Sequence, residues 1–313
     1  MHNQPIGTLD RMFEAASRLP EKRIAVVAPA NAETFEAIRV SAERLPTRFI
    51  LAGDASAIRA GIRGSAAAEA KCEILDLPGA VAALGASIEL LMRGEADLLL
   101  KGSVDTATMM RAVLDERAGL RTGRLLSDVS VFEYPGRAGN KLVMITDGGL
   151  TPAPDLKGKV ELIQNAVEVA HALGHAQPKV AVLSASEFVT AAIPSSIDAA
   201  ALAKMNERGQ ISGCLVDGPL ALDSAISPEA VREKGIRSAV AGGAEILIAP
   251  TIEAANALAK SATLFAGYRM AHVIQGSNVP ILIPSRADRS DTKLLSVALG
   301  MLMSEYRKGA GKR

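Results

Sequence analysis

A serine and an arginine, Ser285 and Arg286, stand side by side near the end of the chain, just after a short apolar segment. The segment Val279–Ile283 has a turn signal at each end, which predicts a buried strand. The residues from about Ser290 to Met303 predict a helix behind the pair. A guanidinium presents a fork of donors that matches phosphate, and helix N-termini favour negative charge. We therefore expect an anion-binding turn between this strand and this helix.

Polar or glycine-rich turns also follow other apolar segments, at Lys101–Ser103, Asp147–Gly149 and Asp217–Pro219. Open α/β sheets bind ligands at the C-terminal ends of their strands, so these turns could gather at one edge. Each turn taken alone also fits an ordinary turn or helix cap. Asp288 and Asp291 allow two interpretations in the same way: a capping pair of the last helix, or a source of the general base beside the anion site.

The elements that must position these turns alternate between strand and helix. This alternation predicts right-handed βαβ units and a mostly parallel sheet. One strand pair around a turn at 136–139 is typical of an antiparallel insertion. The expected strands cover 23–28, 48–52, 72–76, 97–100, 128–133, 142–146, 179–183, 214–216 and 246–249, and the expected helices cover 33–44, 79–93, 159–173, 196–208, 228–241 and 253–266.

Composition narrows the classes of partner. Hydrophobic residues make up 49% of the chain, which suits Ala-rich helices on Val/Ile/Leu strands. No uncharged apolar run reaches the roughly 18 residues of a membrane span, so we expect no membrane contact. Aromatic residues make up only 3% and the net charge is +1, which argues against a nucleic-acid partner. The two cysteines have no metal-binding spacing, so we expect no metal and a reducing, cytoplasmic setting.

Several common catalytic motifs are missing from the sequence. No GxGxxG follows the first expected strand, and the Lys-Gly-Ser turn at 101–103 lacks the order and glycine spacing of a Walker loop. No GxSxG elbow occurs, and the four histidines form no catalytic or zinc pattern. Dinucleotide binding, nucleotide hydrolysis and esterase chemistry therefore have no direct support.

The segment Val273–Pro280, followed by Ser285-Arg286, resembles the closing motif of phosphate acetyltransferases and phosphate butyryltransferases, with the same spacing. The resemblance covers roughly residues 20 to 305 and is closest to the butyryltransferase branch. The other matches keep the family's order along the chain: Lys101–Thr106, Leu126-Ser127, Val131–Glu133, Ile145–Gly149, Pro154–Leu156, Val216–Asp223 and Ala249–Asn256, the last with Ala255 where the family has glycine.

The resemblance implies reversible acyl transfer, acetyl or butyryl, between coenzyme A and inorganic phosphate. Coenzyme A is then a substrate, with no permanently bound cofactor. The implied fold is a two-domain α/β fold like that of the isocitrate and isopropylmalate dehydrogenases, with mostly parallel sheets and helices on both faces. We expect one domain from residues 1–152 with 275–313, a second from 153–274, and the active site in the cleft between them. The resemblance also implies a homodimer or higher homo-oligomer.

The same resemblance implies roles for particular residues. Arg286 would bind the phosphoryl group, and Ser285 would donate a hydrogen bond in the transition state. The aspartate that acts as the general base in the family aligns with Thr292. We therefore take the adjacent Asp291 as the base, with Asp288 as the alternative. The family often has histidine at Asp128. The expected substrate contacts are Lys101, Thr106, Ser127, Gln275, Gly276 and Asn256.

A thiolate is the nucleophile of coenzyme A, and Ser285 has no histidine nearby in the sequence to activate it. We therefore expect direct attack in a ternary complex rather than a covalent acyl-enzyme. Two other functions remain open from the sequence alone. One is a metal-dependent dehydrogenase on the same fold, and the other is a non-catalytic homologue that binds coenzyme A or acyl phosphate.

Overall fold

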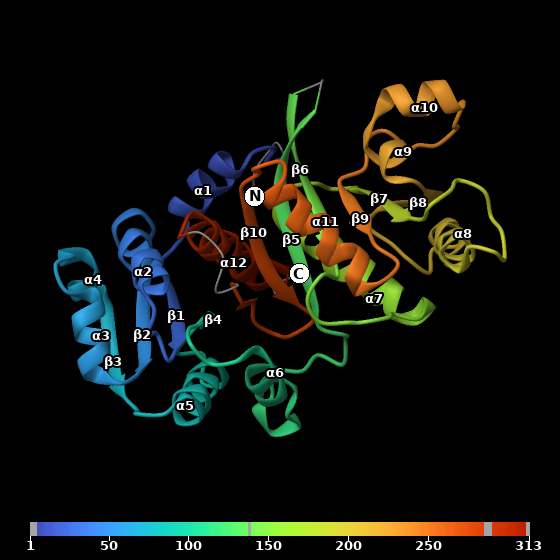
Figure 1. Ribbon diagram of the computed structural model, residues 1–313. Coiled ribbons are helices and arrows are strands. Elements are labelled where there is room, and N and C mark those ends of the chain that lie inside the picture. The colour runs from blue at the N-terminus through green and yellow to red at the C-terminus, as the bar shows by residue number, and fades with distance from the viewer. Residues whose placement is uncertain (1–4, 137–138, 285–289, 311–313) are drawn as a thin grey trace. The chain divides into compact units, whose positions relative to one another are not determined.

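In the computed structural model, the chain forms two compact α/β units (Figure 1). The part of the chain that the structure describes comprises residues 5–136, 139–284 and 290–310. Neither unit is continuous in sequence. Unit 1 is formed by Met1–Leu9 and Leu125–Met270, and unit 2 by Asp10–Arg124 and Ala271–Arg313.

This division differs from the expected one in the place of the hairpin and of the first nine residues. From the sequence we expect the strand pair near 128–146 in the first domain, with a boundary at 152. In the structure that pair belongs to unit 1, with the second series of strands. The C-terminal return to the other unit begins at Ala271, close to the expected residue 275.

Unit 2 is built on a sheet whose central strands are almost completely buried. The residues Ile24 to Val27 are 0% exposed, as their apolar run predicts for a strand covered on both faces. The strand order is β3-β2-β1-β4-β11-β10, parallel except for the last strand. The strands are β1 (Lys22–Val27), β2 (Thr47–Gly53), β3 (Cys72–Asp76), β4 (Leu98–Lys101), β10 (Met270–Gln275) and β11 (Ile281–Leu282).

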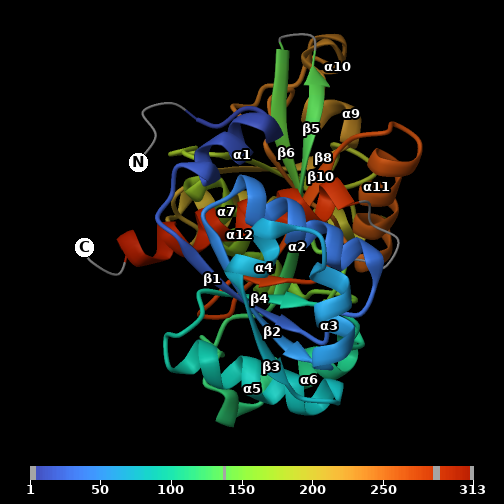
Figure 2. The same cartoon turned by 90° about the vertical axis from the view of Figure 1, so that its left-hand side faces the viewer.

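Helices cover both faces of this sheet. Because parallel crossovers are right-handed, the helices after β1 and β2 lie on one face, and the helix after β3 lies on the other. Figure 2 shows α5 on the opposite side of the strands from α2 and α4. The helices are α1 (Leu9–Ser17), α2 (Ala32–Arg44), α3 (Ala55–Ile62), α4 (Ala66–Lys71), α5 (Ala80–Met92), α6 (Thr106–Leu114), the 3-10 turn η1 (Glu116–Ala118) and α12 (Ser290–Ala310).

Unit 1 contains the expected hairpin beside a parallel sheet. The hairpin strands β5 and β6 are antiparallel, as predicted, and β6 then pairs in parallel with β9. The order is β5-β6-β9-β7-β8, so four neighbouring strands end at the same edge. The strands are β5 (Ser127–Gly136), β6 (Gly139–Thr146), β7 (Lys179–Leu183), β8 (Leu215–Leu220) and β9 (Ile246–Ile248).

Alternation along β6 explains how this sheet is packed. Val143 and Ile145 belong to a core shared with α9 and α11, while Leu142 and Met144 are buried toward the other face. The helix expected over 228–241 ends at Lys234, because Gly235 takes the left-handed conformation (φ +65°) that closes a helix. The helices are α7 (Leu156–Ala172), α8 (Pro194–Glu207), α9 (Leu222–Ile226), α10 (Pro228–Lys234) and α11 (Ile252–Leu264).

The architecture is a mixed α/β fold with mostly parallel strands covered by helices, as the alternating sequence pattern predicts. Among the described residues, no helix is both long enough and apolar enough to cross a membrane.

Candidate active site

Two neighbouring parallel strands of unit 2, β4 and β11, end at the same edge of the sheet. Ile281 pairs with Leu99 and Leu282 pairs with Leu100, so the chain leaves both strands at the same level. Lys101 closes β4 at this edge. The turn with Ser285, Arg286 and Asp288 follows β11 in sequence, but these three residues lie outside the described part of the chain.

The turn after β4 packs tightly against the end of β1. The Gly102 N–H donates to the Val27 carbonyl and the Ser103 N–H donates to the Ala28 carbonyl, both at 2.9 Å. A Cβ at Gly102 would lie only 2.3 Å from the Val27 carbonyl oxygen. Ala28 itself has φ +46°, which is strained for a residue with a side chain. Only glycine fits at 102, and it places the buried Lys101 at the sheet edge.

Helix α6 begins at this same edge with Thr106, which is exposed. Asp105 is the N-cap, and its Oδ1 accepts the Thr108 N–H at 2.8 Å. Backbone N–H groups at a helix N-terminus favour a bound anion. The structure therefore brings two of the predicted substrate contacts, Lys101 and Thr106, to one edge of unit 2.

The candidate base Asp291 lies in the first turn of α12, where it is half-buried. Its Oδ1 accepts the N–H of Thr292 at 2.9 Å. Thr292, which the resemblance places at the position of the family's aspartate, is 8% exposed, so Asp291 is the more accessible of the two positions.

The structure separates Gln275 and Gly276 from Lys101. Strand β10 runs antiparallel to β11, so it ends at the opposite edge of the sheet from β4. Gln275 is completely buried, and its Oε1 accepts a hydrogen bond from the Arg307 guanidinium. The Thr122 hydroxyl donates to the Gly276 carbonyl at 2.5 Å. These contacts hold the end of β10 at the edge opposite Lys101, so these predicted substrate contacts are not brought together with Lys101.

Ser127, another predicted contact, is part of the packing of unit 1. It is 0% exposed, and the Asn165 Nδ2 donates to its Oγ at 2.9 Å. The same Nδ2 donates to the Leu125 carbonyl, also at 2.9 Å. These bonds fix the start of β5 against α7, which gives Ser127 a structural contact rather than an exposed hydroxyl.

The Asp-Gly-Gly turn after β6 contains Asp147, a residue to which the sequence alone assigns no role. Asp147 is 3% exposed, and its carboxylate accepts the backbone N–H groups of Asp128, Gly149, Leu150 and Thr151 at 3.1, 3.0, 3.2 and 2.8 Å. Burial raises the pKa of Asp147, as does the charge of Asp128, although these hydrogen bonds act in the opposite direction. The signal in the sequence was an acidic residue followed by two glycines at a strand end.

Asn256, in the first half of α11, is exposed and lies against the same turn. Its Nδ2 donates to the Gly148 carbonyl at 2.9 Å. A Cβ at Gly148 would lie 3.4 Å from the Asn256 Cα, so the turn and the helix are in close contact. The Asp147 turn therefore connects Asn256 to the start of β5 at the C-terminal edge of the unit 1 sheet.

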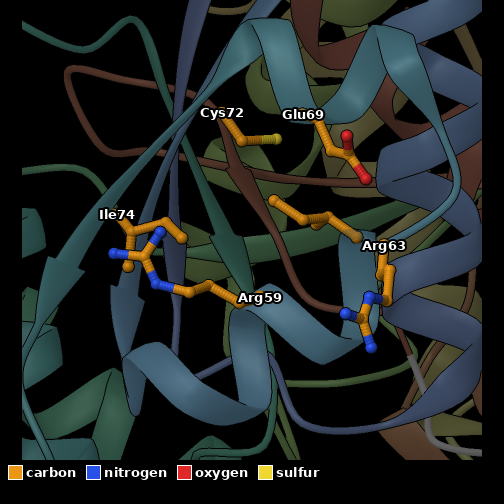
Figure 3. Close-up of a pocket in the computed structure, with 6 residues that line it drawn as sticks. Arg59, Arg63, Glu69, Cys72 and Ile74 are labelled. Atoms are coloured by element: carbon orange, nitrogen blue, oxygen red, sulfur yellow. The ribbon is translucent and has the colours of Figure 1, made fainter.

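A hollow in unit 2, of about 390 Å³, contains none of the predicted site residues (Figure 3). Burial raises the pKa of the Cys72 thiol in its wall to about 12, which keeps the sulfur protonated and unreactive. The side chains of Arg59 and Arg63 point in different directions there and do not converge on one point. Within the described ranges, no group of three or more His, Cys, Asp or Glu residues is placed to hold a metal ion.

Comparison with solved structures gives the class of protein. The chain is similar to a branched-chain phosphotransacylase from Enterococcus faecalis V583, with a TM-score of 0.79 and 29% identity over 90% of this chain and 99% of that one. With EutD phosphotransacetylase from Staphylococcus aureus the TM-score is 0.74 over 95% of this chain and 98% of that one; at 18% identity this supports the fold alone. The fold is that of the phosphotransacylases, and the chain is an acyltransferase.

Sequence comparison gives the family. Residues 80–301 match the family model described as "Phosphate acetyl/butaryl transferase". The chain is 40% identical to a phosphate butyryltransferase of Clostridium beijerinckii, over 96% of this chain and 98% of that one. It is also 40% identical to a phosphate acetyltransferase of Thermotoga maritima, over 95% and 99%. The chain belongs to this family, which confirms the resemblance.

Proposed function

We propose that this acyltransferase converts acyl-CoA and inorganic phosphate reversibly into acyl phosphate and coenzyme A. The acyl group that it transfers is acetyl or butyryl. The observation that carries the proposal is the parallel pairing of β4 with β11. It supports a phosphate site at one edge of unit 2, with Lys101 and the N-terminus of α6 next to the strand that leads to Ser285 and Arg286.

Arg286 and Ser285 keep the roles that the resemblance implies. A phosphate group carries close to two negative charges at pH 7, and a guanidinium can pair with two of its oxygens. The carbonyl oxygen gains charge as the thiolate attacks, so the Ser285 hydroxyl would stabilise it by donating a hydrogen bond. Lys101 and Thr106 would supply further contacts to the phosphate.

A free thiol has a pKa of about 8.5, so coenzyme A needs a base near neutral pH. We propose Asp291 for this task, with Asp288 as the alternative. The thiolate then attacks the acyl phosphate directly in a ternary complex, and phosphate leaves. On unit 1, we propose that Asn256 contacts coenzyme A, which is the family's thiol substrate.

Finer parts of the expectation also remain proposals. They are the isocitrate and isopropylmalate dehydrogenase-like detail of the fold, the homodimer or higher homo-oligomer, and the cytoplasmic location. A dehydrogenase activity and a non-catalytic binding role are not favoured, because the full-length relatives are phosphate acyltransferases.

The test is phosphate-dependent release of coenzyme A from acetyl-, propionyl- and butyryl-CoA, compared by kcat/KM. Trapping the product with hydroxylamine as a hydroxamate separates acyl phosphate formation from simple thioester hydrolysis. We expect release that requires phosphate, with a preference of up to about 200-fold per methylene group. Release that is independent of phosphate, or no release from any of the three thioesters, would contradict the proposal.

A further inference from the structure

The turn after β6 has an acidic side chain, Asp147, at its centre, where many turns have an uncharged one. Asn and Ser also satisfy the N–H groups of turns and helix starts. Asp147 is buried and lies beside a second carboxyl, Asp128, and both factors raise the pKa of its carboxyl group. Ionising it therefore costs free energy that a neutral side chain in the same turn would not cost. Such locally unfavourable groups are concentrated at functional sites.

The carboxylate uses both of its oxygens to hold the start of β5 and the turn together. One oxygen, Oδ1, accepts from Asp128 at the start of β5 and from Gly149 and Leu150 in the turn. The other, Oδ2, accepts from Thr151. A neutral Asn side chain has a single acceptor oxygen, so it can replace Oδ1 but leaves the Thr151 N–H facing an amide nitrogen that cannot accept.

The turn held in this way carries the carbonyl that orients Asn256. The Gly148 carbonyl accepts one N–H of the Asn256 amide, which fixes the plane of that amide. The amide then presents its other N–H and its oxygen from an exposed position on α11. One donor beside one acceptor matches the amide groups along the pantetheine arm of coenzyme A.

From these contacts we infer that Asp147 is a positioning residue for coenzyme A, acting through the Gly148–Thr151 turn to orient the Asn256 amide. The inference rests on the proposed function in taking coenzyme A as the ligand. Asp147 itself does not touch the ligand. Its removal should therefore weaken binding by the same amount as removal of Asn256, and no further.

A double-mutant cycle on coenzyme A binding, measured by calorimetry, tests this coupling. We expect D147N and N256A each to raise the Kd of coenzyme A about tenfold. The double variant should also lie near tenfold, because residues that act as one unit are not additive. A rise of about a hundredfold in the double variant, or an unchanged Kd in D147N, would overturn the inference.

The matched control is D155N. Asp155 caps α7 by accepting the Gly158 N–H at 2.7 Å and is exposed, so Asn should replace it without effect. Thermal unfolding checks that each variant is folded, and D147S replaces D147N if the latter is not. Coupled binding without acyl phosphate formation would support the inference and contradict the proposed function. A wild-type chain that does not bind coenzyme A would overturn both.

Discussion

The Nδ1 of His175 lies 2.6 Å from the Oε1 of Glu245, in a buried part of unit 1. The other ring nitrogen of His175 faces the Ile6 carbonyl at 3.3 Å. The second oxygen of Glu245 accepts the Lys179 N–H at 3.0 Å. This pair therefore attaches the N-terminal segment to the start of β7.

The His175–Glu245 pair predicts that the free energy of unfolding depends on pH. Burial alone would lower the pKa of His175, but the hydrogen bond and charge of Glu245 raise it above 6.5. Burial would raise the pKa of Glu245, but its bonds to His175 and Lys179 hold it below 4.5. The histidine's contribution is complete below pH 6.5 and is lost as the pH rises through its raised pKa. The glutamate's contribution is complete above pH 4.5 and is lost as the pH falls through its lowered pKa.

We therefore expect the free energy of unfolding to fall by about 1–2 kcal/mol as the pH rises above 6.5, and H175Q to lose most of this dependence. Urea unfolding across this pH range measures it. H171Q is the control, because His171 contacts the Gly213 carbonyl and is not part of the pair. A slope that persists unchanged in H175Q would assign the effect to other groups.

The tight packing of the turn after β4 predicts that Gly102 cannot be replaced by a larger residue without loss. In G102A the new Cβ meets the Val27 carbonyl oxygen, so the backbone must move and Lys101 with it. We expect a loss of about 1–3 kcal/mol in stability and at least about tenfold in kcat/KM. G85A, on α5 where nothing lies within 4 Å, should instead gain about 0.5 kcal/mol. Equal behaviour of the two variants would contradict this account of the turn.

Arg286 is expected to hold the phosphoryl group. R286A should lose at least about 2 kcal/mol of transition-state stabilisation, or roughly 30-fold in kcat/KM. The measurement is coenzyme A-dependent breakdown of acyl phosphate. R59A, an exposed arginine beside the hollow in Figure 3, should stay within about twofold of the wild type. An unchanged rate in R286A would remove this residue from the site.

The two candidate bases are separated by their pH profiles. D291N should lower kcat by about a hundredfold near pH 7. The loss should shrink as the pH approaches the thiol pKa of about 8.5, because the thiolate then forms without help. D288N should show little change. The reverse result would identify Asp288 as the base, and normal profiles in both would place the base elsewhere.

Local patterns predicted much of the fold. The strands at 72–76 and 179–183 begin and end at the expected residues, and the hairpin forms around its expected turn. Strand β10 was not predicted. Its reversed direction depends on pairing with β11 rather than on any local period.

The difference between local patterns and long-range strand pairing also explains which candidate site residues could be placed together from the sequence. Lys101 and Thr106 are close in sequence, at a strand end and a helix start, so a local pattern could place them together. Gln275 and Gly276 lie at the opposite edge of the sheet from Lys101, because β10 runs antiparallel to β11. A sequence motif does not specify the direction of the strand that carries it. The four N–H groups around Asp147 come from two segments that meet only after folding.

Unit 2 begins at Asp10 but is completed only by residues after Ala271. Synthesis from the N-terminus therefore delivers every strand of unit 1 before β11 can cover the free edge of β4. Until then β4 presents unpaired backbone groups, which invite pairing with another chain. A premature stop after Met270 would leave unit 1 with its full sequence and unit 2 with an open, aggregation-prone sheet.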